Sequence, residues 1–153
     1  MSYLSRVTGL DAIGIRQGRA RQHKSVVNFD DATLASGGTL GAAAAATEKR
    51  DGVLCVLSLP AASYTLTANA PTPLVLAGVL SPGVRPAADT EIGTVAVVDN
   101  GNARRAKVVA KSGGNVELTP IDVAGADLED GAWAATSTQV VSWSAVSGCF
   151  IAA

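Results

Sequence analysis

The sequence predicts an all-β fold, a jelly roll or β-sandwich of about seven or eight short antiparallel strands. From residue 53 onward, short apolar runs rich in β-branched side chains alternate with turn residues. One of these turns is Asn100-Gly101, the preferred sequence of a tight β-hairpin. Strand patterns do not alternate with long helical patterns, so a parallel α/β fold is not expected.

Residues 1–37 are predicted to form an extended N-terminal arm, followed by a single β domain over residues 38–153. Glycines recur through the first part of the arm, and no apolar stripe of helical spacing persists there for two turns. Within the arm, only Val26–Phe29 has the pattern of a short strand. Turn residues at Asp30-Asp31 and Ser36–Gly38 then separate the arm from the domain.

Residues 41–50 are the best candidate for a helix, and we expect at most one short helix in the chain. Alanine, the strongest helix former, fills the first part of this stretch. Thr39 is placed to cap its start, and Asp51-Gly52 is a typical helix end. Because an isolated helix of this length is marginal in water, it would need packing to persist.

Three strands are expected between residues 53 and 80. Val53–Leu59 is a continuous apolar run ended by Pro60, which is typical of a strand buried on both faces. Ser63–Thr67 alternates between apolar and polar side chains, as a half-buried strand does. Leu74–Leu80 is another apolar strand, and the prolines before it predict a loop or a sheet edge.

The clearest local pattern lies in residues 94–109, where two strand-like runs flank Asn100-Gly101. A type I′ turn needs positive φ at both central residues, which Asn and Gly adopt most readily. A second turn leads to Val116–Thr119, which predicts a three-stranded meander. The first hairpin is expected to place four apolar side chains on one face: Val95, Val97, Ala106 and Val108. The remaining expected elements are an acidic loop and two strands: residues 120–131, 139–146 and 148–151.

The composition predicts one domain whose faces are partly covered by neighbours. The chain has 153 residues, of which 48% are hydrophobic but only 4% aromatic, so its apolar side chains are mostly small. Charged residues make up 16%, below the roughly 25% of a typical soluble domain. A surface with few charges suits contact with other subunits, and a biased genomic base composition is the alternative explanation.

No residue pattern in the chain predicts an enzyme, a cofactor or a metal site. His23 is the single histidine, and we interpret it as a polar residue of the arm. One histidine and two distant cysteines do not complete a zinc site. Cys55 and Cys149 both lie among apolar residues, so we interpret them as buried thiols, with a disulfide or a reactive cysteine as alternatives.

The basic run Arg16–Lys24 is the main candidate for a binding element. The first 29 residues are predominantly basic, whereas residues 112–153 carry acidic side chains and no basic one, which favours contact between the arm and a neighbour. Nucleic acid is the alternative partner, but the aromatic side chains that stack on single strands are sparse. We therefore predict a protein interface formed by apolar and basic arm residues: Leu10, Ile13, Ile15, Arg16, Arg19, Arg21 and Lys24.

A charge-poor β domain with an extended arm and no catalytic motif resembles the capsid decoration, or cement, proteins of tailed bacteriophages. The resemblance is one of architecture over the whole chain, and no sequence motif carries it. It implies a structural virion protein on the outer surface of the capsid, with the major capsid protein as partner. It also implies self-association as a dimer or trimer, which raises avidity for neighbouring capsid subunits.

The same sequence features bear on localisation. Residues 1–15 lack the apolar run of a signal peptide, and no stretch is apolar over the length of a membrane span. We therefore expect synthesis in the host cytoplasm without a signal peptide, and no contact with a membrane.

Two other functions remain as alternatives to a virion protein. The first is a carbohydrate- or cell-surface-binding β module that presents Trp133 or Trp143 to a ligand. Tryptophans within strand patterns are more often part of the core, which is our interpretation of both. The second is a small enzyme, for which the sequence offers no catalytic motif.

Overall fold

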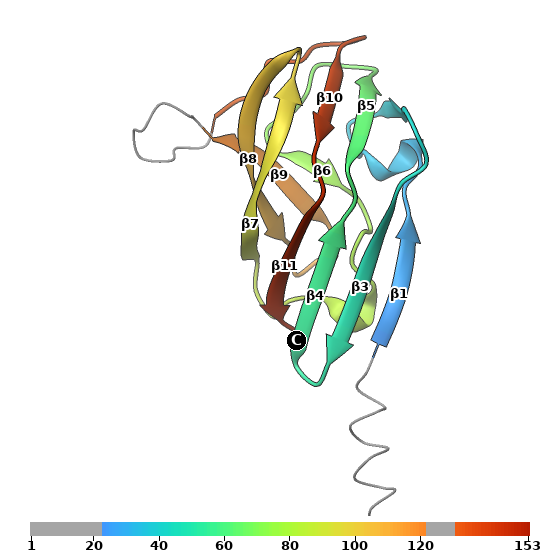
Figure 1. Cartoon of the computed structure of the whole chain (residues 1–153), viewed down its shortest axis with the longest axis vertical. Helices are drawn as coiled ribbons and strands as arrows, with labels where there is room; N and C mark the ends of the chain where they lie inside the picture. Colours follow the sequence, from blue (N-terminus) through green and yellow to red (C-terminus); the bar gives the residue numbers. More distant parts are fainter. Residues whose placement is uncertain (1–22, 122–130) are drawn as a thin grey trace, which may run out of the picture.

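The computed structural model confirms the all-β fold (Figure 1). The structure describes residues 23–121 and 131–153. These residues form one four-stranded and one seven-stranded antiparallel sheet. Their helical turns are two short 3-10 helices, η1 (Asp31–Thr33) and η2 (Pro82–Val84).

The four-stranded sheet has the strand order β1-β3-β4-β11. Side chains alternate along each strand, so that inward ones fill the core and outward ones reach solvent. β1 forms one edge of this sheet, at the right of Figure 1. The bounds of the strands are His23–Asn28 for β1, Ala45–Asp51 for β3, Leu54–Leu59 for β4 and Val146–Ile151 for β11.

The seven-stranded sheet has the strand order β2-β5-β10-β7-β8-β9-β6. Its two longest strands, β7 and β8, form the predicted hairpin. The bounds of the strands are Gly38–Leu40 for β2, Ala62–Leu66 for β5, Leu74–Leu76 for β6, Thr90–Asp99 for β7, Asn102–Ala110 for β8, Val116–Ile121 for β9 and Val140–Trp143 for β10.

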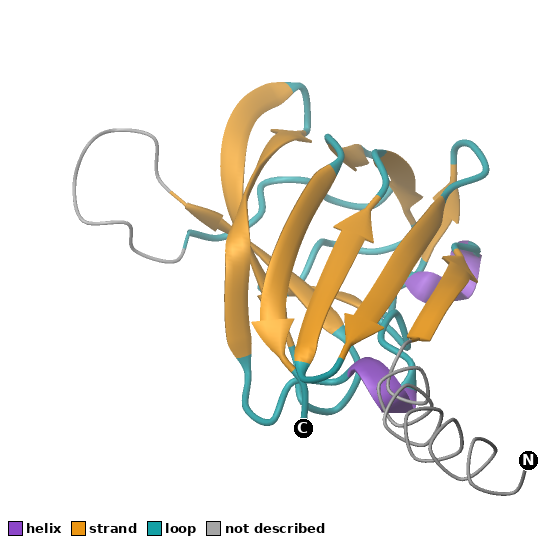
Figure 2. Cartoon of the chain, turned by 60° about the horizontal axis from the view of Figure 1, so that its bottom comes forward, coloured by secondary structure: helices purple, strands orange, loops and turns teal. Residues whose placement is uncertain are grey.

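The chain passes between the two sheets at four connections between described consecutive strands, and the two sheets enclose one core (Figure 2). Two of these connections are very short. Only Pro60-Ala61 separates β4 from β5, and Ser144-Ala145 separates β10 from β11. Proline has no N–H for the ladder, which explains why β4 ends there. The core is mainly aliphatic and contains a stacked pair, Tyr64 and Trp143, with ring centroids 5.9 Å apart.

The predicted hairpin and meander are confirmed. Asn100 and Gly101 have φ of 51° and 81°, the two positive values that a type I′ turn needs. β8 also pairs with β9, which completes the meander. The four apolar side chains expected to share one face are all buried: Val95, Val97, Ala106 and Val108.

β11 passes so close to β7 that the contact requires a glycine. A Cβ added to Gly148 would overlap the carbonyl oxygen of Ile92 in β7. The register of β7 shifts between Glu91 and Gly93, beside this contact. Such a bulge increases local bending, and the first half of β7 here lies against the edge of β11.

The helix predicted over residues 41–50 is wrong, because the second half of this stretch is strand β3. Alanine-rich composition gave a helical preference, but pairing with β1 and β4 on both sides overrides it. Inward and outward side chains also alternate along this stretch, as in a strand, but the run of alanines obscured this pattern in the sequence. Ala46 and Glu48 are buried, while Lys49 is exposed and Thr47 is half-buried on the opposite face.

Residues 23–37, which the sequence analysis assigned to the arm, are packed into the β body. β1 pairs along its whole length with β3, and it extends the strand predicted at Val26–Phe29 toward the N-terminus. Phe29 and Leu34 belong to the buried core. The turn predicted at Asp30-Asp31 is η1, whose capping box joins Asp30 and Thr33. The boundary expected at residue 37 therefore does not separate β1 from its sheet.

Several predicted strands are present with shifted bounds. β4 was expected to be buried on both faces, but its outer face is open and Leu54 is 47% exposed. β6 ends at Leu76, earlier than the predicted Leu80, and lies at a sheet edge as the neighbouring prolines indicated. β9 continues to Ile121, into the stretch predicted as an acidic loop. Residues 122–130 of that loop lie outside the described residues.

Candidate protein-interaction surface

The outer face of the four-stranded sheet carries few charges. Outward side chains there are mostly small or apolar, since β4 and β11 contribute serine, valine, leucine, isoleucine and cysteine. The charged side chains that the strands present on this face are Lys24, Lys49 and Asp51. A face with so little charge has a low desolvation cost when another protein covers it.

Three apolar side chains form a continuous corner at one end of this face. Leu54 and Ile151 are directly opposite each other across β4 and β11, and Val53 precedes Leu54 in the turn. Their exposed fractions are 54% for Val53, 47% for Leu54 and 58% for Ile151. We call these three residues the apolar corner. Large apolar side chains exposed as a group indicate a contact surface more strongly than single ones do.

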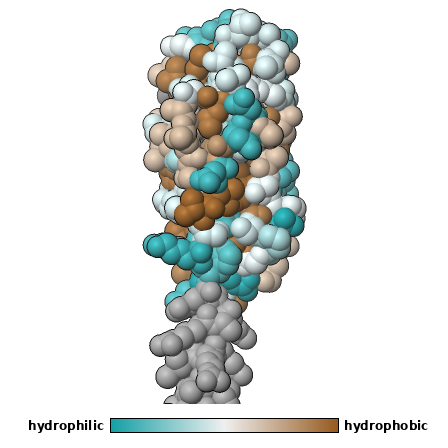
Figure 3. All heavy atoms as spheres, turned by 90° about the vertical axis from the view of Figure 1, so that its right-hand side faces the viewer, coloured by the Kyte–Doolittle hydropathy of each residue, from teal (hydrophilic) through white to brown (hydrophobic). Residues whose placement is uncertain are grey.

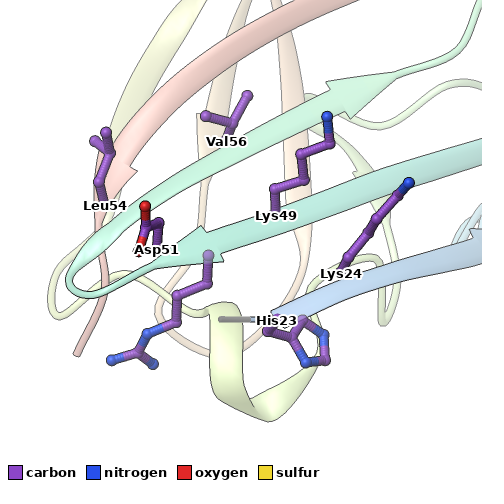
Figure 4. Close-up of a pocket in the computed structure, with 7 residues that line it drawn as sticks. His23, Lys24, Lys49, Asp51, Leu54 and Val56 are labelled. Carbon is purple, nitrogen blue, oxygen red and sulfur yellow. The ribbon is translucent and has the colours of Figure 1, made fainter. Parts of the chain in front are cut away.

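A depression of about 360 Å³ adjoins the apolar corner (Figure 4). Leu54 and Val56 form its apolar part, on β4. Lys24 and Lys49 stand on the same side of the sheet, from the neighbouring strands β1 and β3. This combination of an apolar floor and two ammonium groups suits a partner surface that is apolar next to carboxylates.

A buried carboxylate fixes β1 beneath this face. Glu48 points inward from β3 and is fully buried. Its carboxylate accepts hydrogen bonds from the Ser81 N–H (2.6 Å), the Ser81 hydroxyl (2.6 Å) and the Ser25 hydroxyl. His23 Nε2 lies 3.8 Å from the same carboxylate. Both serine hydroxyls thus donate directly to the carboxylate, and the cluster joins β1, β3 and the start of η2. In a catalytic Ser-His-acid triad the serine donates to the histidine instead, so this cluster is not arranged as a triad.

β1 exposes an unpaired backbone edge. The Phe29 N–H donates to the Ala44 carbonyl (2.8 Å), which fixes the ladder so that residues 23, 25 and 27 bond to β3. The alternate groups point away from the sheet, and nothing in residues 23–121 and 131–153 hydrogen bonds to them. Figure 3 shows this side of the molecule, where apolar patches lie between hydrophilic ones. We call the N–H and C=O groups of Lys24, Val26 and Asn28 the open edge.

An acidic depression lies beyond the far end of β1. Asp30 and Asp31 line it together with small residues of the segment between β2 and β3. Both aspartates are exposed, although Asp31 also accepts a hydrogen bond from the Leu40 N–H (2.8 Å). The two ends of β1 therefore differ in charge, with lysines near its start and carboxylates after its end.

Of the predicted interface residues, the structure places Lys24, on the outer face of β1. That position brings Lys24 next to Lys49, its direct neighbour in register on β3. The other six lie outside the described residues: Leu10, Ile13, Ile15, Arg16, Arg19 and Arg21. The apolar corner and the open edge were not predicted. The apolar corner was hidden because the run Val53–Leu59 was interpreted as buried on both faces.

Both tryptophans lie in the core, as the sequence analysis interpreted them. Trp133 and Trp143 are 6% and 4% exposed. Their indole N–H groups donate to the carbonyls of Leu118 (3.2 Å) and Pro60 (3.0 Å). Neither ring is presented as a stacking platform for a sugar.

The two cysteines differ, and only one matches the prediction of buried thiols. Cys55 is fully buried in β4, and burial raises the pKa of its thiol. Cys149 is exposed, because in β11 it occupies an outward position next to Val56. Both thiols are free. Cys149 thus lies on the charge-poor face itself.

The described residues contain neither a cluster of metal-ligating side chains nor a helix suited to span a membrane. Within residues 23–121 and 131–153, no three His, Cys, Asp or Glu side chains are grouped as metal ligands would be. In the same part of the chain, no helix has the length and apolar character of a membrane span.

Comparison with known proteins gives a distant structural similarity. No protein-family model matches the sequence, and no curated protein matches it. Among solved structures, the chain is similar to the reovirus attachment protein sigma1, crystallised in complex with alpha-2,3-sialyllactose. The TM-score is 0.46 at 14% sequence identity, over 88% of this chain and 68% of that chain. The function is therefore inferred from the surface of the molecule.

Proposed function

We propose that the protein is a structural virion protein that decorates and stabilises the capsid of a tailed bacteriophage. It oligomerises on the outside of the shell and clamps neighbouring subunits of the major capsid protein. The observation that carries the proposal is the charge-poor outer face of the four-stranded sheet, which ends in the apolar corner. Such a face is suited to being covered by another protein.

The partner surface is expected to be apolar with a rim of carboxylates. Val53, Leu54 and Ile151 supply the apolar contact, and Lys24 and Lys49 supply positive charge beside it. Apolar side chains at the centre of an interface supply most of its affinity, while the charges at the rim add specificity. The basic residues between Arg16 and Lys24 extend the same charge preference along the sequence.

The hydrogen bonds made by the two buried carboxylates support a function other than catalysis. Glu48 is held by Ser25 and Ser81. Asp99 is equally buried, and it accepts from the Arg104 guanidinium (2.8 Å) and from two backbone N–H groups. Carboxylates engaged in this way hold strands together and present no free acid or base to a substrate.

Cosedimentation with purified phage heads tests the proposal. The variant Leu54→Glu/Ile151→Glu places two carboxylates in the apolar corner, so we expect its dissociation constant for heads to rise about tenfold or more. Val98→Glu/Val140→Glu is the matched control, since these valines are 41% and 43% exposed on the other sheet. The control is expected to bind like the wild type. Equal binding of both variants, or no binding of the wild type, would contradict the proposal.

Cys149 provides a direct probe of the same face. Because its thiol is exposed next to Val56, a maleimide should label it in the free protein. On decorated heads the shell covers this face, so labelling should become at least about tenfold slower. Labelling at the same rate in both states would show that another face binds the shell.

A carbohydrate- or cell-surface-binding module was the alternative from the sequence. The tryptophans that this alternative needed at the surface are buried and hydrogen bonded. A glycan site would therefore have to use other residues, and we favour the virion protein.

A further inference from the structure

β1 is the sheet edge that the described part of the chain leaves uncovered. The edge of β2 is covered where Asp31 accepts from the Leu40 N–H, and the edge of β6 is bonded by residues 33–35. The edge of β11 lies against β7. At β1, by contrast, three residues in alternation have no backbone partner among residues 23–121 and 131–153. An uncovered edge of this kind is a template for a further strand.

We infer that the open edge pairs with the same edge of a second copy of this chain, in a two-fold symmetric dimer. Two-fold symmetry makes identical edges run antiparallel, so the two four-stranded sheets become one continuous sheet. An axis at Val26 pairs all three residues of the open edge with residues of the open edge of the second copy. Val26 then opposes Val26 of the second copy, and Lys24 opposes Asn28 on either side. Three such pairs supply about six backbone hydrogen bonds.

The side chains fit this register. Val26 is 59% exposed, and pairing would cover it with the valine of the second copy. Each Lys24 meets the neutral amide of Asn28 and not another lysine, so no like charges are directly opposed. A register that centred the axis on Lys24 would oppose two ammonium groups.

Charge at the ends of β1 favours a second copy over an unrelated strand. In antiparallel pairing, Lys24 of one copy opposes Asn28 of the other and comes close to the residues that follow Asn28. Those residues include the exposed Asp30 and Asp31 of the acidic depression. Lys24 near the start of β1 is thus complementary in charge to the carboxylates that follow the same strand in a second copy.

The dimer deepens the self-association that the proposed function includes, but it forms in solution without a capsid, so the two are tested separately. The interface is small, so the dimer should dissociate on dilution. Analytical ultracentrifugation of the full chain should therefore show a mass that rises with concentration from 15.3 kDa toward twice that value. A monomer at about 1 mM would overturn the inference.

The variant Val26→Pro tests the edge directly. The Val26 N–H is not part of the β1–β3 ladder, so proline is tolerated there in the monomer. It removes the two central hydrogen bonds of the dimer, and we expect the dissociation constant to rise about tenfold or more. Val26→Thr keeps the N–H and is the matched control, expected to remain dimeric. A dimer that persists in Val26→Pro, with unchanged circular dichroism, would overturn the inference.

Two further measurements keep the test decisive if Val26→Pro disturbs β1. Val26→Glu and Val26→Lys should each weaken the dimer about two- to fivefold, and their mixture should restore it as a heterodimer. Amide hydrogen exchange should slow with concentration at Lys24, Val26 and Asn28, while Ser25 and Val27 stay protected throughout. Edge pairing would be contradicted if the two variants formed no heterodimer, or if the amide exchange rates did not depend on protein concentration.

Discussion

At the scale of single residues, buried polar groups fix how the strands join. The carboxylate of Asp99 accepts hydrogen bonds from the backbone N–H groups of Ala134 (2.7 Å) and Ala135 (2.8 Å). It thereby anchors the segment after residue 131 to the β7–β8 hairpin, with Arg104 completing the ion pair. Glu48 has the same role for β1 and η2. Such groups are costly to bury unless fully satisfied, so each fixes one arrangement of its neighbours.

The two thiols should differ sharply in reactivity. We expect a disulfide reagent to modify Cys149 in the native protein at the rate of an exposed thiol, and Cys55 only on unfolding. Burial raises the pKa of the Cys55 thiol, which further disfavours its reactive thiolate in the folded chain. Peptide mass spectrometry after brief labelling identifies the modified residue, and Cys149→Ser is the control that should remove the fast phase. Fast modification of Cys55 in the folded chain would contradict its burial.

At the scale of elements, the edges of the sheets decide which surfaces are available. The Leu40 N–H of β2 donates to Asp31, residues 33–35 bond to the outer side of β6, and β11 lies against β7 where Gly148 faces Ile92. β1 has no such cover in the described residues, and its strand alternation also sets Val26 outward. The location of the proposed dimer interface therefore follows from which edges the fold itself covers.

Gly148→Ala should destabilise the fold, because Gly148 lies where β11 packs closely against β7. The added methyl group would overlap the backbone of Ile92, which is unable to yield like a flexible side chain. We expect the free energy of unfolding to fall by about 1–3 kcal/mol. Gly113→Ala is the control, because no atom lies within 4 Å of the added Cβ there, and it should change stability by about 0.5 kcal/mol or less. Urea denaturation measures both, and equal stabilities would contradict the close contact.

At the scale of the whole molecule, the charge-poor face and the open edge belong to the same sheet. Pairing two copies through β1 would place two such faces side by side in one continuous surface. A dimer of this kind presents two apolar corners to a shell, and two linked contacts bind more tightly than one. Self-association and capsid binding would thus use different parts of one sheet, the edge and the outer face.

Two N-terminal deletions separate the body from the segment before it. Removing residues 1–22 leaves every described strand intact, so we expect the thermal unfolding midpoint to change by no more than a few degrees. Removing residues 1–29 deletes β1 and the buried Phe29, and we expect a decrease of about 10 °C or failure to fold. Circular dichroism measures both. Equal midpoints would contradict the position of β1 in the sheet.

Much of the β body could be predicted because its signals are local. Asn100-Gly101 specifies its own turn through backbone preferences, and the runs on either side carry the alternation that buries one face. Pro60 ends β4 for an equally local reason. The presence of most strands was likewise predicted from runs of a few residues, and the low surface charge was predicted from the composition. These features depend on neighbours within a few residues, which the sequence shows directly.

Which strands pair, and so which surfaces stay open, depended on distant contacts. Residues 45–51 form a strand and not a helix because β1 and β4 satisfy their backbone on both sides. The run before Pro60 has an exposed face because nothing in the described chain covers β4 there. The open edge of β1 likewise exists only once the sheet order is known. The sequence alone determined the local strands and turns, whereas the tertiary structure decided the edges and faces on which both proposals rest, because those depend on which segments meet across the whole chain.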